Sequence, residues 1–338
     1  MSLFNVDEPA KLPEPQKKVE NKSKKPAKIK EIKQDEEEIK NLKPLQQIKS
    51  FKAVEENIVS QFKNNKLHHA IMLSGKYGIG KATFAYWLIS RLILSTCENK
   101  DNKEELTQMH LEMLNRNIHP DVFFLELQEN ENEIKIEQIR SFIEKISLKS
   151  TYGNKFIIID DINSINKNGI NALLKTLEEP PENTYFFIIN HQNSVLLDTI
   201  YSRCNEIKLK LSKNDCMQIL QNQNENLTFD EIEFYTTVSN NSIKLANILI
   251  DLDIKTTLQQ PQKTATLLNI IYKSIEVKYK QLSRTIKMSV LENIITYLIH
   301  QKIINDENDN VKNNIIENNS ILKQFYNMKT FELPVLFI

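Results

Sequence analysis

From residue 53 onward, short apolar runs alternate with amphipathic stretches along the chain. The apolar runs are rich in β-branched and aromatic residues and read HAIML, DVFFLE, KFIIID, YFFIIN and EIKLKL. Strands that are apolar on both faces are typical of a parallel sheet covered by helices on each side. The pattern therefore predicts an α/β domain with a parallel sheet, to which we assign residues 46–211.

After this domain the strand pattern stops and helix start signals follow one another. Ser212 with Asp215 and Thr228 with Glu231 have capping-box spacing, and Ser242 is placed to cap a third helix. We expect a small three-helix lid followed by an all-α C-terminal domain, over residues 212–254 and 255–338.

Residues 1–45 form a separate compositional zone. Proline and charges of both signs dominate there, and large apolar residues are few. Such a segment buries too little surface to offset its ordering entropy, so we expect a disordered charged tail. The short apolar start SLFNV leaves a docking arm as the alternative. The segment also lacks the apolar region of a signal peptide.

Charge and cysteine content narrow the function classes. Lys+Arg and Asp+Glu are both 44, so the net charge of zero disfavours a protein that holds nucleic acid by bulk charge. Three cysteines without a C-x-x-C pair favour a reducing cytoplasm over a disulfide scaffold. The longest apolar stretch, 84–94, is interrupted by Arg91 and is far shorter than a membrane span.

The stretch LSGKYGIGKATFAYWL contains most of a phosphate-binding loop. It follows an expected strand and precedes an expected helix, which is the context that the G-x-x-x-x-G-K motif requires. Backbone N–H groups and the helix N-terminus make an anion cradle there, and Lys81 adds a point charge for the β- and γ-phosphates. Three of the chain's five glycines lie in this loop: Gly75, Gly78 and Gly80.

The hydroxyl that normally follows the motif lysine is missing. That hydroxyl binds Mg²⁺ in P-loop NTPases, and Ala82 has none. Thr83 does not substitute, because one step along a helix turns the side chain by about 100°. Backbone and Lys81 contacts to ATP would survive, whereas Mg²⁺-assisted hydrolysis in this chain's own site is disfavoured. The alternative is a retained fold with an inert site.

A second acidic signature, KFIIIDDIN, ends the third apolar run. Asp160 is placed to hold a magnesium-bound water, and Asp161 stands where ATPases of this type usually carry a glutamate as base. The simpler interpretation is an aspartate that caps the next turn.

NALLKTLEEPP over 171–181 and TIYSRC over 199–204 resemble the clamp-loader branch of the AAA+ ATPases, and HPDVFFLE and IKIEQIRSF fit the same pattern. Taken together, the chain is similar to the delta-prime subunits of bacterial DNA polymerase III clamp loaders. The resemblance covers 67–211 and, less closely, 212–254. It implies an AAA+ P-loop domain, a helical lid and a helical collar.

The resemblance also implies roles for single residues. Arg203 in SRC looks like an arginine finger that reaches a neighbouring subunit's γ-phosphate, a task suited to a fixed, always charged fork. The simpler interpretation is a surface arginine in a salt bridge. Asn190 matches the sensor position on the fourth strand. Lys244 falls where active ATPases of this family carry a lid arginine.

Departures from the family pattern separate the sibling subunits. The resemblance implies that an ATP-hydrolysing gamma/tau subunit would carry a hydroxyl at 82, glutamate at 161, arginine at 244 and zinc-binding cysteines. This chain has none of these, which favours a delta-prime type.

A zinc set is not expected from the remaining candidates. Cys97, His110 and His119 match no known cluster spacing. We expect His110 on a helix surface and His119 in a turn before Pro120.

The favoured interpretation is a scaffold subunit that donates Arg203 in trans. Its partners would be the gamma/tau and delta subunits, with the sliding clamp and primed DNA reached through the assembly. One alternative is a self-sufficient ATPase, either a divergent gamma/tau subunit or another AAA+ motor. A third is a DNA-binding regulator that uses the lysine-rich tail.

Overall fold

The computed structural model describes residues 48–305 except 99, 128–130, 132, 192–197, 260–263 and 283. The expectations for the tail and for the chain beyond 305 lie outside these residues.

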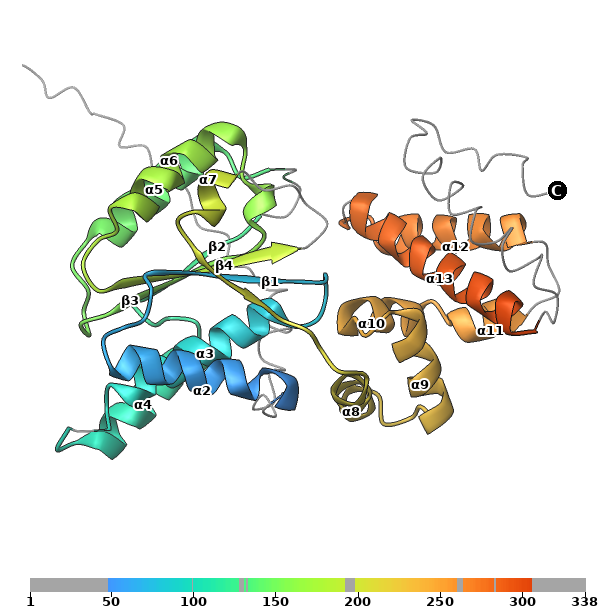
Figure 1. Cartoon of the computed structure of the whole chain (residues 1–338), viewed down its shortest axis with the longest axis horizontal. Coiled ribbons are helices and arrows are strands. Elements are labelled where there is room, and N and C mark those ends of the chain that lie inside the picture. The colour runs from blue at the N-terminus through green and yellow to red at the C-terminus, as the bar shows by residue number, and fades with distance from the viewer. Residues whose placement is uncertain are drawn as a thin grey trace, which may run out of the picture. The chain divides into compact units, whose positions relative to one another are not determined.

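Five parallel strands form one sheet in the order β2-β3-β4-β1-β5 (Figure 1). All four neighbouring pairs run parallel, which confirms the predicted sheet. The strands are β1 Ala70–Gly75, β2 Val122–Leu125, β3 Lys155–Ile159, β4 Thr184–His191 and β5 Asn205–Lys208. The fifth strand is shorter than its apolar run, since pairing with β1 ends at Lys208 and the leucines after it, Leu209 and Leu211, pack into the core.

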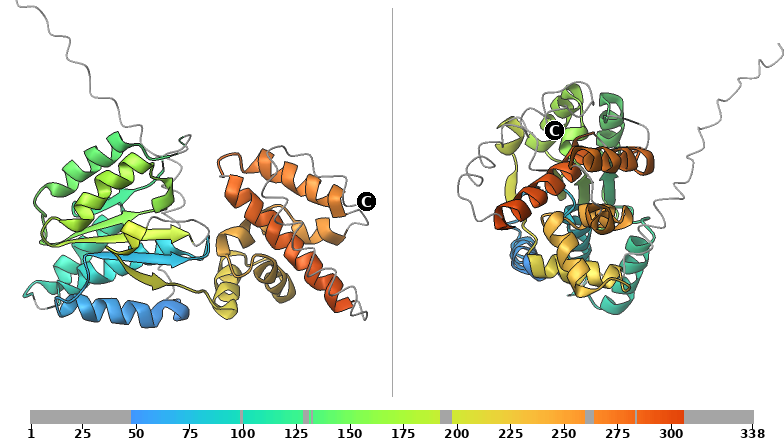
Figure 2. Two further views of the ribbon diagram at one scale, coloured as in Figure 1. Left: turned by 45° about the horizontal axis from the view of Figure 1, so that its top comes forward. Right: turned by 90° about the vertical axis from the view of Figure 1, so that its right-hand side faces the viewer.

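Helices cover both faces of this sheet (Figures 1 and 2). Alternate side chains of β1 enter the two layers: Ile71 and Leu73 face one, whereas Ala70 and Met72 face the other. The double burial explains why the strands are apolar on both faces. The first layer holds α2 Lys49–Lys63, α3 Lys81–Ser95 and α4 Lys103–Asn115, and the second holds α5 Ile136–Ser147, α6 Lys167–Glu178 and α7 Asp198–Tyr201.

Three helices follow the sheet and pack on one another: α8 Lys213–Gln223, α9 Phe229–Val238 and α10 Ile243–Asp251. Their predicted N-caps are confirmed. The Ser212 hydroxyl accepts the backbone N–H of Asp215, Thr228 and Glu231 form a complete capping box, and the Ser242 hydroxyl caps α10.

The first capping box differs from expectation in its acidic half. The Asp215 carboxylate accepts the backbone N–H of Ser50 at 2.8 Å and also the Ser50 hydroxyl. Ser50 lies in the first turn of α2. The capping motif predicts that the Asp215 side chain binds the N-terminus of its own helix, α8, but it instead joins α8 to α2. Such a partner has no local sequence signal.

The described chain ends in three further helices, α11 Ile254–Gln259, α12 Thr264–Lys278 and α13 Arg284–Asn305. Helix α13 packs against α12 and α9, and the rings of Phe234 and Tyr297 meet edge to face at 5.3 Å between centroids. Among the described residues, no helix combines the length and apolar character needed to cross a membrane. The domain boundaries themselves stay a prediction.

The expectation that His110 lies on a helix surface is wrong. His110 is only 1% exposed, and its Nδ1 lies 3.0 Å from Nε2 of His119, itself buried in its turn. The Tyr152 ring meets His110 edge-on at 4.7 Å. Burial of the two imidazoles is tolerated because each gives the other a hydrogen-bond partner. The spacing of residues within one helix does not reveal a partner from another segment.

The hydrogen bonds fix the tautomers of this pair. Nδ1 of His119 accepts the backbone N–H of Asp121 at 3.2 Å, so the proton of the neutral ring sits on Nε2 and is donated to His110. The Asp121 carboxylate accepts two further backbone N–H groups, of Thr151 and Tyr152. Burial and the neighbouring His110 lower the pKa of His119 to about 4, against an opposing effect of Asp121.

This cluster makes stability depend on pH in a defined direction. A histidine in the unfolded chain titrates near about 6.5, whereas folded His119 stays neutral to about pH 4. Its contribution is therefore fully present above about pH 6.5 and is lost as the pH falls toward 4. We expect an imidazole NMR titration to give His119 a midpoint near 4, and His119→Gln to flatten the fall in unfolding free energy over this window. A His119 midpoint near 6.5 would contradict the assignment.

Candidate functional site

Strand register brings the candidate residues to one edge of the sheet. β1 lies beside β4, with Ser74 opposite Asn190 and Gly75 opposite His191, and β3 lies on the far side of β4. The carboxyl ends of parallel strands share one edge, where α/β proteins bind their ligands. The phosphate loop, the residues after β3 and the end of β4 therefore meet there.

The three loop glycines each have a backbone reason. A Cβ at Gly75 would lie 2.6 Å from the carbonyl oxygen of Leu209. Gly78 and Gly80 have φ of 75° and 90°, in the left-handed region that favours glycine. Gly80 is also the N-cap of α3. Because glycine has no side chain to cap the helix, the first backbone N–H groups of α3 remain available to an anion bound in the loop.

Lys81, the predicted phosphate-binding lysine, is buried within the loop. Its ammonium donates to the carbonyl oxygens of Gly75 at 2.8 Å and Lys76 at 2.6 Å. Burial lowers the pKa of Lys81 to about 8, and the negative charges of Asp160 and Asp161 act in the opposite direction. A phosphate in this loop would compete with those two carbonyls for the ammonium.

The next two residues lie in the first turn of α3. Ala82 is half-buried, and its methyl group packs against the apolar core. Thr83 is half-buried too. Position 82 thus offers packing and no oxygen to a metal ion.

The two aspartates after β3, Asp160 and Asp161, have different environments. Burial and the charge of Asp161 raise the pKa of Asp160, while Lys244 and Lys81 oppose the rise. Asp161 has φ of 57°, and its Oδ1 accepts the backbone N–H of Asn163 at 3.2 Å and its side-chain amide at 2.9 Å. Asp161 therefore caps the short helix η1, Ile162–Ser164. Its role as a base stays a prediction.

Asn190 is 2% exposed and joins two elements. Its side-chain amide donates to the hydroxyl of Tyr201 in α7 at 3.0 Å, and its Oδ1 accepts from Asn163 at 3.5 Å. Sequence reasoning missed both partners. Only the polar position at the end of an apolar strand marks the site locally.

His191 is a residue of the site that the sequence did not predict. It lies opposite Gly75, and its ring meets the Tyr77 ring edge-on at 5.0 Å. Burial, followed by the charge of Lys81, lowers the pKa of His191 to about 4. A neutral imidazole thus lines the site beside two lysines.

The lid contacts the phosphate loop directly. The backbone N–H of Lys244 donates to the carbonyl oxygen of Gly78 at 3.1 Å, and the Lys244 ammonium lies 5.6 Å from the centre of the Tyr77 ring. Lys76 donates to Asn240 at 2.8 Å. The structure therefore brings Lys244 to the loop, and its role at a bound nucleotide stays a prediction.

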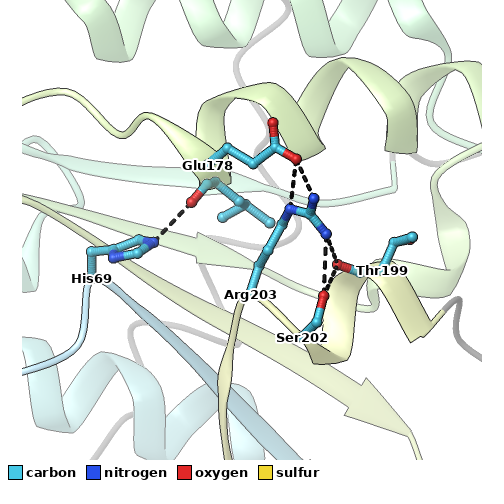
Figure 3. A network of polar contacts seen from close by, with 6 residues as sticks. His69, Glu178, Thr199, Ser202 and Arg203 are labelled. Carbon is cyan, nitrogen blue, oxygen red and sulfur yellow. Dashed lines mark hydrogen bonds and ion pairs between the residues drawn. The ribbon is translucent and has the colours of Figure 1, made fainter.

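Arg203 lies apart from these contacts, where α7 leads into β5 (Figure 3). Its guanidinium forms an ion pair with Glu178 at the end of α6, and it also contacts Thr199 and Ser202. Its side chain is 30% exposed. An intrachain ion pair is thus the simpler interpretation of Arg203; its reach toward a neighbour stays a prediction.

The strand order, the glycine loop after β1, the acidic pair after β3 and the helical lid define an AAA+ P-loop ATPase fold. A family profile described as "DNA polymerase III, delta subunit" matches residues 50–213. The DNA polymerase III subunit delta-prime of Buchnera aphidicola subsp. Acyrthosiphon pisum is 31% identical over 254 residues, which cover 67% of this chain and 76% of that protein. The chain belongs to the delta-prime family of DNA polymerase III subunits.

Other similar proteins match this chain to different extents. The delta-prime subunit of Pseudomonas aeruginosa is 36% identical over 137 residues, which cover 40% of this chain and 41% of that protein. The tau/gamma subunit of Haemophilus influenzae is 30% identical over 186 residues, 52% of this chain and 25% of that protein. A solved structure of a gamma subunit-related protein from Thermotoga maritima is 17% identical to this chain, with a TM-score of 0.45. The match covers 83% of this chain and 94% of that protein's chain.

The contact between lid and loop can be tested at two glycines. An added Cβ at Gly78 would lie 2.4 Å from the Ser242 hydroxyl, whereas one at Gly80 meets nothing within 4 Å. Both substitutions carry the left-handed backbone cost of roughly 1–2 kcal/mol. Gly78→Ala should lose about 1–3 kcal/mol more, because the lid is forced off the loop.

Urea unfolding of the two variants measures that difference. Gly80→Ala is the matched control for backbone strain. Equal losses in the two variants would show that the lid does not dock on Gly78.

Proposed function

We propose that this chain is a clamp-loader scaffold subunit that makes its chemical contribution in trans. The observation that carries the proposal is that this chain's own site keeps its phosphate-binding groups but lacks groups for Mg²⁺-assisted hydrolysis. The anion cradle and Lys81 are kept, but Ala82 has no oxygen for Mg²⁺ and the Asp161 carboxylate caps η1. Catalysis at a neighbour's site, with Arg203 as the arginine finger, fits such a chain.

The remaining roles follow from the same proposal. Asn190 and Lys244 would contact a nucleotide bound at the loop, and Asp160 would face its phosphates. ATP would be held by the backbone cradle and Lys81, with Mg²⁺ weakly bound at most. Partners are gamma/tau-type and delta-type subunits in the cytoplasm, and the assembly would place a sliding clamp on primed DNA.

A self-sufficient ATPase is the second candidate. It is favoured by the complete cradle and by the similarity to tau/gamma subunits as well as delta-prime subunits. It would need Mg²⁺-dependent turnover by the isolated chain without the hydroxyl at position 82.

ATP turnover of the assembled clamp loader tests the proposal. Arg203→Ala should lower kcat by about 10³-fold, because a guanidinium that stabilises the transition state is removed. Arg140→Ala, which removes an exposed arginine of α5, is the matched control and should leave kcat unchanged.

The isolated chain should turn over little ATP with Mg²⁺, because no hydroxyl follows Lys81. Robust turnover by the isolated chain, indifferent to Arg203→Ala, would overturn the proposal in favour of the second candidate.

A further inference from the structure

The guanidinium of Arg203 is held from two sides (Figure 3). On one side Nε donates to Oε1 of Glu178 at 2.8 Å, and Nη2 donates to the same oxygen. On the other side Nη1 donates to the carbonyl oxygen of Thr199 at 2.7 Å and to the hydroxyl of Ser202 at 3.1 Å. Glu178 comes from α6, whereas the other two partners belong to the segment that carries Arg203 itself.

These bonds leave little of the guanidinium for another ligand. A guanidinium has five N–H groups, and the four bonds use all but one of them, an N–H of Nη2. A phosphate is held best by two parallel N–H groups. Arg203 must therefore give up at least one bond before it can hold a phosphate in that way.

The chemistry of the partners decides which bond is exchanged. All four bonds have the charged guanidinium as donor, but only the two bonds to Glu178 also have a charged acceptor, so these two are the stronger. The partners of Nη1 are a carbonyl and a hydroxyl, both neutral. Release of Nη1 comes first, and it leaves one N–H of Nη1 and the remaining N–H of Nη2 as a two-pronged edge, while Glu178 stays bound to the adjacent Nε–Nη2 edge.

Glu178 itself is well placed to act as a fixed support. It is the last residue of α6, whose last two turns bury Leu173 and Leu177 in the core. The carbonyl oxygen of Leu177 accepts from Nε2 of His69, just before β1, at 2.8 Å. This bond ties the end of α6 to the sheet (Figure 3).

We propose that Glu178 is the positioning residue for Arg203, orienting the Nη1–Nη2 edge of the guanidinium toward the phosphate of a neighbouring subunit. The inference rests on the proposed function of Arg203 and adds a residue to it. Glu178 keeps its bonds while the neutral contacts at Nη1 are exchanged for phosphate oxygens.

The test is steady-state ATP turnover of the assembled clamp loader. Glu178→Ala should lower kcat by about tenfold with KM for ATP unchanged, because a misdirected guanidinium loses part of its effect on the transition state. Glu178→Gln keeps one acceptor for Nε at equal size, so it should restore part of the lost rate. Glu179→Gln is the matched control, because Glu179 follows directly and makes no side-chain contact with Arg203 among the described residues; its kcat should equal wild type.

A double-mutant cycle separates this role from a general structural one. In the Arg203→Ala background, Glu178→Ala should cause no further loss of kcat, since nothing is left to position. Further loss in that background would overturn the proposal, as would a kcat for Glu178→Ala at or above wild type, which would mark Glu178 as a competitor of the phosphate. Unchanged turnover in Arg203→Ala alone would overturn the proposed function of Arg203 and this inference together. A full loss in Arg203→Ala with none in Glu178→Ala would overturn only the role of Glu178.

Discussion

The parallel pairing of β1 with β4 and β5 is the constraint on which the rest of the structure depends. β1 has a partner on both sides, which places the start of the phosphate loop opposite Asn190 and His191 and against the carbonyl of Leu209. A one-residue slip in this register would turn every β1 side chain to the wrong layer. It would also move Asn190 away from the loop. Packing and site geometry are therefore set by the same backbone hydrogen bonds.

Charge balance at the site follows from that geometry. Burial lowers the pKa of Lys81, and the charges of Asp160 and Asp161 oppose that shift. Burial also raises the pKa of Asp160, which the charges of Lys81 and Lys244 oppose. His191 stays neutral because it is buried beside lysine charge. The site thus holds two lysines beside two aspartates, and position 82 offers no hydroxyl to a metal ion.

Local sequence signals predicted the elements well. Strand runs, the glycine loop and the three N-caps depend on neighbours within a few residues, so the strands, α3 and α8–α10 could be read from the chain. Partners from distant segments could not. Ser50 for Asp215, His119 and Tyr152 for His110, and Tyr201 for Asn190 are set by tertiary packing, which overrides what a single helix or turn indicates. The family signature located Arg203, whereas the carboxylate that holds it emerged only from the structure.

The order of strands in the sheet also has a consequence for synthesis. Ala70 of β1 pairs with Phe186 of β4, and Ile71 pairs with Asn205 of β5, so both partners of β1 leave the ribosome more than a hundred residues later. At the usual rates of translation this gap lasts on the order of 10 s. During that time an almost wholly apolar strand has no sheet to join. This topology therefore leaves an apolar segment unpaired during synthesis, and aggregation before β4 is made is the hazard that follows.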